Sequence, residues 1–582
     1  MEQIVTGIYF YISLNIERLN LQFKISLMNR IFKAILIFNF SLLIINSGNA
    51  QFTHQDTLRG SNGPGRDWWD VLAYKINIEP DYNTKTIQGV NEISFKATRQ
   101  GKANIMQVDL QQPLVIDSIF LDTKRINKIT REGNVYWIDF GNLKFNITPV
   151  NQMHPHYRML IYYHGEPVVA KRPPWDGGWI FAKDEKGRPW MSVACQGRGA
   201  SVWYPCKDWQ GDEPDAGATI RIIVPDSLVA ISNGKMIGDG VNMGKRYTTW
   251  NVINPINNYN IIPYIGKYVN WKESYEGEKG KLDCGYWVLD YDQEKAKEQF
   301  KQVPQMLKAF EYWFGPYPFY EDGYKLIEAP HLGMEHQSAV AYGNGFKNGY
   351  RGRDLSASGW GLKWDFIIVH ESGHEWFANN ITTVDIADMW VHEGFTNYSE
   401  TLFTEYYYGK EAGSDYCIGT RRLIENDKPI IGPYGVNKEG SGDMYYKGGN
   451  MLHTIRHVIN DDEKFRSILR GLNSKFYHSL VTTKQIENYI SEQSGKDLSK
   501  IFDQYLRTTM IPVLEYKFTG DNMYYRWANC VEGFNMPVKL NGAKDDWLKA
   551  TTEWKTVAVT AEILKDGLKI DRNFYITIKK VD

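Results

Sequence analysis

The chain has 582 residues, of which 43% are hydrophobic and 14% aromatic, and its formal net charge is −1 at pH 7. This length exceeds what one hydrophobic core holds, so we expect several domains, and the apolar content excludes an intrinsically disordered protein. The balanced charge excludes a strongly basic surface, so we expect no nucleic-acid partner. The five cysteines have no metal-ligand spacing and cannot all pair. Cys195 and Cys206 could form a disulfide, but free buried thiols fit the sequence equally well.

The first fifty residues are typical of an export signal. A positively charged start at residues 28–33 is followed by an apolar run at 34–45 and by the small-residue site Gly48-Asn49-Ala50. The run is too short to span a bilayer. We therefore expect residues 1–50 to be a signal region with the true start at Met28 and cleavage after Ala50, and no membrane span after its removal. Export with few cysteines indicates the periplasm or the exterior of a bacterium.

The pattern of apolar residues divides the rest of the chain into three regions. Residues 51–288 contain short alternating runs separated by turn-rich segments, which predicts an N-terminal β domain, a saddle or sandwich. Residues 289–510 carry apolar residues at three- and four-residue steps, which predicts a mainly helical domain. Alternation returns over residues 511–582, which predicts a small C-terminal β-sandwich. The expected fold class is therefore α+β with several domains.

The stretch Trp364 to Glu400 carries the strongest functional signal. Its centre is His370-Glu371-Ser372-Gly373-His374, and eighteen residues separate His374 from Glu393. Two histidines four apart on a helix lie on one face, where both can bind a single Zn²⁺. Glu371 can reach a water at the metal, and Glu393 is the candidate third ligand, carried by a second helix. The competing interpretation is a core helix with two hydrogen-bonded histidines.

This pattern resembles the aminopeptidase N family of gluzincins, whose usual form is HExxH, eighteen residues, then a Glu within a W-L-N-E-G-F-A-like stretch. Here that stretch is residues 390–396, WVHEGFT, with His392 where the family usually has Asn. The resemblance covers nearly all of the chain after the signal region, as a short form without the C-terminal helical domain of many members. It implies a thermolysin-like catalytic domain, one Zn²⁺ per chain held by His370, His374 and Glu393, and peptide substrates with a free N-terminus.

Three further segments resemble elements of the same family. Residues 332–336, LGMEH, resemble its G-A-M-E-N substrate element, which implies substrate contacts for Gly333, Met334 and Glu335, with Glu335 on the α-amine. The sequence departs from that element, because Leu332-Gly333 replaces Gly-Ala and His336 replaces Asn. A Gln nine residues before Pro-Cys also matches the family, which implies that Gln196 lines the substrate N-terminus; the alternative is a polar loop residue.

The third segment, residues 445–448 with the letters YYKG, resembles the Y-E-K-G element of the family. The spacing assigns the catalytic tyrosine to Tyr445, and its neighbour Tyr446 is the competing assignment. The remaining alternative is an aromatic residue that only packs at the start of a helix. In the implied reaction Glu371 is the general base, and the Tyr445 hydroxyl donates to the developing oxyanion, a contact worth roughly 3–4 kcal/mol.

Two carboxylates flank the third ligand in the sequence. Asp388 lies five residues before Glu393 and Glu400 lies seven residues after it, and we predict that each supports a ligating histidine, although both could be solvated charges. The leading functional hypothesis is a zinc aminopeptidase. The alternatives are an epoxide-hydrolase-like relative, a zinc endopeptidase and an inactive peptide-binding protein. The preferred N-terminal residue and the oligomeric state stay open.

Overall fold

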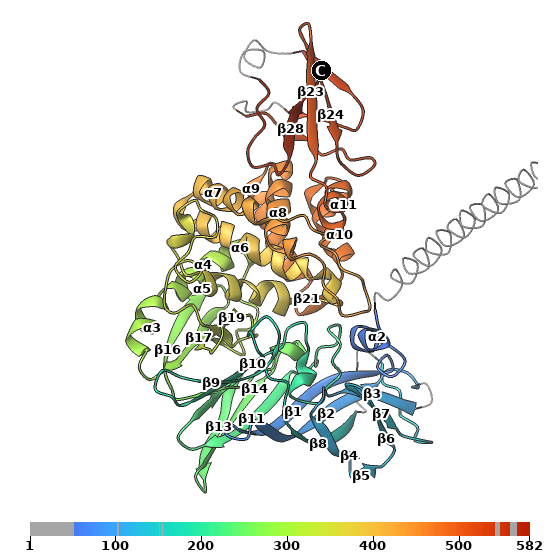
Figure 1. Ribbon diagram of the computed structural model, residues 1–582, viewed down its shortest axis with the longest axis vertical. Helices are drawn as coiled ribbons and strands as arrows, with labels where there is room; N and C mark the ends of the chain where they lie inside the picture. The colour runs from blue at the N-terminus through green and yellow to red at the C-terminus, as the bar shows by residue number, and fades with distance from the viewer. Residues whose placement is uncertain (1–51, 102–103, 150–151, 153–155, 542–546, 559–566) are drawn as a thin grey trace, which may run out of the picture. The chain divides into compact units, whose positions relative to one another are not determined.

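The computed structural model describes residues 52–101, 104–149, 152, 156–541, 547–558 and 567–582 (Figure 1). The expected signal region, residues 1–50, lies outside these ranges. The chain divides into one unit of residues 1–57 and a second of residues 58–582, joined within helix α2 (His54–Gly60), and the site lies in the second unit. Among the described residues, no helix has both the length and the hydrophobicity that are needed to cross a bilayer.

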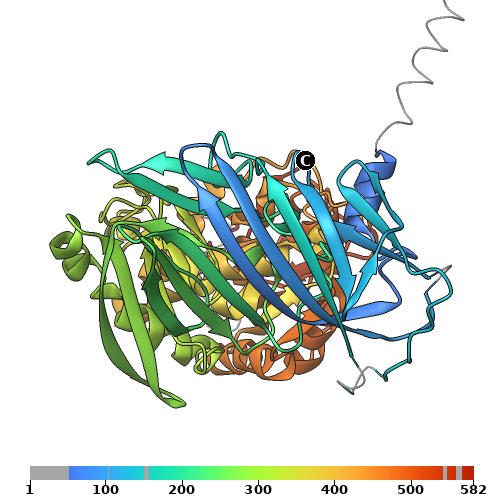
Figure 2. The same ribbon diagram turned by 90° about the horizontal axis from the view of Figure 1, so that it is seen from below.

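The first part of the second unit is built from three sheets. Their strands are β1 (Trp69–Asp81), β2 (Thr86–Ala97), β3 (Ile105–Asp109), β4 (Val115–Leu121), β5 (Lys124–Ile126), β6 (Ile129–Glu132), β7 (Val135–Asp139), β8 (Tyr157–Gly165), β9 (Gly178–Lys183), β10 (Pro189–Ala194), β11 (Ala218–Pro225), β12 (Val229–Ile231), β13 (Lys235–Asn242), β14 (Lys245–Val252) and β15 (Tyr264–Gly266). The sheets have the orders β13-β14-β11-β1-β2-β8-β4-β5, β12-β15-β10-β9 and β3-β7-β6. Figure 2 shows the broad face of the largest sheet, with the helical region behind it.

The alternation of side chains explains this layering. Along β1 the residues Tyr74, Ile76 and Ile78 are buried, whereas Lys75 between them is exposed. A period of two places the apolar residues on one face of the sheet, where they pack against the smaller sheets. Two turns at the end of this layer, at residues 195–199 and 257–260, face the helical region and matter for the site.

A five-stranded sheet opens the next region, with strands β16 (Tyr268–Gly277), β17 (Gly280–Leu289), β18 (Tyr324–Glu328), β19 (Gly333–Met334) and β20 (Val340–Tyr342) in the order β16-β17-β18-β20-β19. β17 spans the boundary predicted at residue 288: it pairs in parallel with β18, and its residues Leu282 and Tyr286 belong to the core of the helical region. Alternation identifies a strand but does not say which sheet it joins. β19 is an edge strand of this sheet.

The helices of this region are α3 (Gln293–Gln299), α4 (Gln302–Phe314), α5 (Phe366–Gly373), α6 (Trp390–Tyr408), α7 (Lys410–Thr420), α8 (Tyr446–Ile459), α9 (Asp462–Lys475), α10 (Thr483–Ser494) and α11 (Ser499–Arg507), with the short parallel strands β21 (Ile381–Thr383) and β22 (Ser479–Val481). Asp365 caps α5 by accepting hydrogen bonds from the N–H groups of Ile367 and Ile368, and all eight residues of α5 are buried. Its apolar residues hold α5 in the core, while His370 and Glu371 on the same helix line the cleft described below.

Helices α6 and α8 approach each other through facing glycines. A Cβ atom built on Gly448 would lie 3.1 Å from Cα of Gly394, so the two backbones are in direct contact. Glu393 precedes Gly394, and Tyr445 lies just before α8 begins. The glycine pair therefore sets how close these two side chains can come.

The last region carries the strands β23 (Val513–Thr519), β24 (Asn522–Ala528), β25 (Val538–Lys539), β26 (Trp547–Leu548), β27 (Lys555–Ala558) and β28 (Thr577–Lys580). They form the sheet β27-β24-β23-β28 and the pair β25-β26. The expected α+β fold class with several domains is confirmed. Cys195 and Cys206 are free, buried thiols.

Candidate active site

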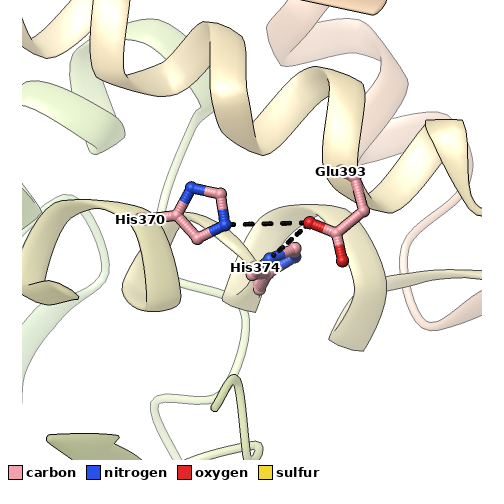
Figure 3. Close-up of side chains that lie close together, drawn as sticks. All are labelled: His370, His374 and Glu393. Atoms are coloured by element: carbon pink, nitrogen blue, oxygen red, sulfur yellow. Dashed lines mark ion pairs between the residues drawn. The ribbon is translucent and has the colours of Figure 1, made fainter. Parts of the chain in front are cut away.

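Three possible metal ligands converge between α5 and α6 (Figure 3). Nε2 of His370 lies 3.7 Å, and Nε2 of His374 3.2 Å, from Oε2 of Glu393. Atoms that bind one tetrahedral zinc lie roughly 3.3 Å from each other, so this donor set fits a single Zn²⁺. Oε2 of Glu393 is buried and accepts no hydrogen bond from the described residues, as expected of an atom whose partner is a metal.

The other ring nitrogen of each histidine faces an acceptor. Nδ1 of His370 lies 2.7 Å from Oε1 of Glu400, and Nδ1 of His374 lies 3.0 Å from the carbonyl oxygen of Phe377. An acceptor at Nδ1 keeps the ring proton there and leaves the lone pair on Nε2, the nitrogen that faces Glu393. Both rings are therefore oriented as metal ligands, and the contact expected of Glu400 is present.

The charges of the site suit a cation and a general base. Burial acts to raise the pKa of Glu393, but His374 and His370 outweigh burial and lower it, so Glu393 is ionised. Burial raises the pKa of Glu371 to about 7, against the opposing effect of the two histidines. A carboxyl group with that pKa can both accept and return a proton near neutral pH.

Glu335 lies at the His374 end of α5. The ligand atoms of Glu335, Glu371 and His374 lie within 4.8 Å of one another. Oε1 of Glu335 accepts hydrogen bonds from Nε2 of Gln196 at 2.6 Å and from the Tyr259 hydroxyl at 2.9 Å. The carboxyl group is buried, and burial raises its pKa. A cation entering beside it would reverse that shift, so the position suits an ammonium group.

The ring of Tyr445 lies beside that of His370. The two rings stack with centroids 6.0 Å apart and planes at 20°. Burial, followed by the charge of Glu393, raises the pKa of Tyr445 well above its usual value, so the hydroxyl stays protonated and can donate. The ring of Tyr446 lies 6.4 Å further on. Of the two tyrosines, Tyr445 is the one whose ring contacts His370 among the described residues.

The possible metal ligands, Glu371, Glu335 and Tyr445 line one cleft of about 820 Å³. Its wall includes ten of the residues predicted from the sequence: Gln196, Gly333, Met334, Glu335, His370, Glu371, His374, Glu393, Glu400 and Tyr445. Phe366, one helical turn before His370 on α5, also lines it, together with Tyr350, whose ring centroid lies 5.3 Å from that of Phe366. The cleft therefore has a carboxylate at one end, aromatic rings at the other, and the three possible ligands between them.

Residues 300–505 of the chain match the peptidase family M1 domain. The chain carries a peptidase family M1 domain. The sequence is 24% identical over 333 residues to alanine/arginine aminopeptidase of Saccharomyces cerevisiae, covering 54% of this chain and 37% of that protein. It is 22% identical over 474 residues to probable aminopeptidase 1 of Sulfurisphaera tokodaii, covering 78% of this chain and 55% of that protein.

The fold is shared with solved structures. An M1 zinc metallopeptidase from Deinococcus radiodurans, solved as a mutant bound to a Tyr-Ser-Ala substrate, superposes with a TM-score of 0.64 at 19% identity, over 77% of this chain and 96% of that one. Against the curated relatives the match is shorter, since the chain spans roughly a third to a half of their length.

Contacts in the structure account for two of the departures from the family's G-A-M-E-N element. A Cβ atom built on Gly333 would lie 2.5 Å from Oε1 of Glu371, so the space of the motif's usual alanine methyl is filled by that carboxylate. His336 faces away from the cleft, and its Nδ1 contacts the Tyr264 hydroxyl. Leu332 and Gly333 line the cleft and His336 does not, so only the changes at positions 332 and 333 can touch a ligand directly.

His392, the third departure, has a structural partner inside the M1 domain. Its Nε2 accepts a hydrogen bond from the N–H of Thr383 at 2.9 Å. Burial lowers the pKa of His392 to about 3, so the ring is neutral and keeps the lone pair that this contact needs. The residue joins the start of α6 to β21 and does not line the cleft.

The role predicted for Asp388 is wrong. Its Oδ1 accepts from the Tyr434 hydroxyl at 2.7 Å and its Oδ2 from the N–H of Thr483 at 3.1 Å, so it holds the first residue of α10 and not a histidine. Asp388 lies in the 3-10 helix Ile386–Asp388, before α6 begins. Helical periodicity therefore does not apply to it, whereas Glu400 lies two turns after Glu393 on the same helix.

Sequence analysis missed three side chains that support the M1 site. The Thr396 hydroxyl lies 3.1 Å from Nδ1 of His374, and Nδ2 of Asn379 donates to the carbonyl oxygen of Glu335 at 2.8 Å. Thr396 could have been found, because it follows Glu393 by three residues on the same helix. Tyr259 could not, because its turn lies in another domain and carries only a turn signal in the sequence.

Proposed function

We propose that this chain is an exported zinc aminopeptidase that hydrolyses the first peptide bond of peptides with a free N-terminus. One observation carries the proposal: a buried carboxylate, Glu335, lies beside Glu371 and His374 in the same cleft. A carboxylate at that place pairs with the α-ammonium of a peptide. It fixes the distance from the chain end to the general base, so only the first peptide bond reaches the reacting groups.

The catalytic roles follow from the positions of the side chains. His370, His374 and Glu393 would hold Zn²⁺, which when bound polarises the scissile carbonyl and makes a water molecule more acidic. Glu371 takes the proton of the attacking water at its carboxylate and returns it to the leaving amine. The Tyr445 hydroxyl donates to the oxygen on which negative charge develops.

The substrate-binding roles belong to the carboxylate end of the cleft. Gln196 and Glu335 receive the α-ammonium, and the edge strand β19, with Gly333 and Met334, offers backbone groups to an extended peptide. The names of the curated relatives support this assignment, since both are called aminopeptidases.

Export belongs to the same proposal. Residues 1–50 would act as a signal region cleaved after Ala50, delivering the enzyme to the periplasm or the exterior of a bacterium. Sequencing the N-terminus of the secreted protein tests this directly. A mature N-terminus upstream of Ala50 would overturn the cleavage site.

The decisive experiment compares aminoacyl chromogenic substrates with their N-acetylated forms, using the zinc-loaded full chain and Glu335→Ala. We expect the wild type to prefer the free amine strongly and Glu335→Ala to lose most of that preference. Equal cleavage of blocked and free substrates by the wild type would indicate an endopeptidase. No chelator-sensitive cleavage of either would indicate an inactive binding protein.

A further inference from the structure

The carboxylate of Glu335 is held by two donors that both come from the N-terminal β domain. Nε2 of Gln196 and the hydroxyl of Tyr259 donate to the same oxygen, Oε1, at 2.6 and 2.9 Å. Gln196 lines the cleft, whereas Tyr259 is buried behind Glu335 and does not line the cleft. With Oε1 occupied from behind, Oε2 is the oxygen that remains for an ammonium group.

Tyr259 belongs to a turn that is itself tightly fixed. The turn is the 3-10 helix Asn258–Asn260, and the side chain of Asn257 caps it by accepting from the N–H of Tyr259. Nδ2 of Asn258 donates to the carbonyl oxygen of Lys207 at 2.7 Å. The Tyr259 hydroxyl therefore extends from a rigid base, which is what a group that orients another side chain requires.

The same turn reaches the backbone of Glu335 by a second route. Nδ2 of Asn260 donates to Oδ1 of Asn379 at 2.6 Å, and Nδ2 of Asn379 donates to the carbonyl oxygen of Glu335 at 2.8 Å. One turn of the β domain thus holds both the side chain and the main chain of Glu335. All four residues are buried, so water does not compete for these contacts.

We propose that Tyr259 is a positioning residue that orients the Glu335 carboxylate toward the α-ammonium of the substrate. This inference rests on the aminopeptidase function proposed above. Tyr259 does not touch the substrate; its hydroxyl fixes the rotation of the carboxylate and so the place where the ammonium is held. Because that place sets the distance to Glu371, the hydroxyl helps to select the first peptide bond.

Tyr259→Phe tests the proposal, because it removes only the hydroxyl. In the zinc-loaded full chain we expect kcat/KM on free-amine substrates to fall about tenfold, mainly through KM, as a lost hydrogen bond to a charged group predicts. The inhibition constant of a free amino acid should rise by a similar factor, while that of its N-acetyl derivative and the zinc content stay unchanged. A merely destabilised protein would not separate the two inhibitors.

Tyr204→Phe is the matched control. The Tyr204 hydroxyl donates to the carbonyl oxygen of Asn258 at 3.0 Å, so this variant loses a buried hydroxyl that contacts the same turn but does not contact Glu335. We expect it to behave as the wild type. In a Glu335→Ala background, Tyr259→Phe should have no further effect, because the group that it orients is gone.

A kcat/KM for Tyr259→Phe within twofold of the wild type would overturn the proposal, and so would an equal loss in Tyr204→Phe. Should Tyr259→Phe not fold, Asn260→Ser interrupts the second route and carries the same expectation for the two inhibitors. A wild type that cleaves blocked and free substrates equally would instead overturn the aminopeptidase function itself.

Discussion

Glu400 allows a sharp test of the metal site, because Asp388 has the same predicted role in the sequence and a different one in the structure. Glu400→Gln keeps the volume of the side chain and removes its charge. The wild-type carboxylate is fully buried, with Oε1 at 2.7 Å from Nδ1 of His370 and Oε2 accepting from the Tyr416 hydroxyl at 2.6 Å. A negative charge at Nδ1 makes Nε2 of His370 a stronger donor to a metal.

The expected magnitude follows from that contact. Loss of a hydrogen-bonded carboxylate behind a ligating histidine weakens metal binding about 10- to 100-fold, which is about 1.4–2.7 kcal/mol. Competition for zinc between the protein and a chromogenic chelator measures this directly, without reference to activity.

Asp388→Asn is the matched control for this measurement. It makes the same change of charge at a buried carboxylate whose partners are Tyr434 and Thr483. We expect its zinc affinity to stay within about twofold of the wild type, because the change is not transmitted to a ligand. An unchanged affinity in Glu400→Gln, or equal weakening in both variants, would refute the reasoning.

Four further outcomes are expected. Activity should be highest above the pKa of Glu371 and be lost as the pH falls through that pKa, because the general base must be ionised. Burial raises the pKa of Glu371 to about 7, and a bound cation lowers it. A flat pH profile between about pH 5 and 8 would contradict this. Gly448→Ala should lower the free energy of unfolding, measured by chemical denaturation, by about 1–3 kcal/mol. Because the added methyl group moves α8 away from α6, kcat of the folded protein should also fall; an unchanged kcat would show that the position of Tyr445 does not depend on the glycine contact. Ala378→Gly should raise the free energy of unfolding by about 1 kcal/mol, since Ala378 has a φ of 141°; a lower thermal midpoint would refute the strain. The thermal midpoint should be the same with and without a reductant, because Cys195 and Cys206 are free thiols.

The parts of the site that lie on one helix could be predicted from the sequence. His370 and His374 share a face of α5, and Glu400 follows Glu393 by two turns of α6, so helical periodicity places each pair. Periodicity has no meaning for Asp388, which lies in a turn before α6, and there the prediction is wrong. The alternation rule had the same limit for residues 280–288, which were predicted as part of the N-terminal β domain, whereas β17 pairs with β18 of the five-stranded sheet.

Contacts between domains were beyond reach for another reason. Tyr259 meets Glu335 only where the β domain packs against the helical region, and no local pattern in a single sequence encodes such a meeting. Gln196 was found through its resemblance to a known segment, not through any physical property of its neighbours. The distances within the zinc-type ligand set likewise depend on the packing of α5 against α6.

The residues around Glu335 come from two parts of the chain, which has a consequence for domain exchange between relatives. The zinc-type ligands and the base come from the helical half, whereas both donors to Oε1 of Glu335 come from the β half. A chimera that kept the helical half and took its β half from a distant relative would preserve the hydrolytic machinery. It would remain selective for the first peptide bond only if the new β half also supplied an amide and a phenol that donate hydrogen bonds to Oε1 of Glu335.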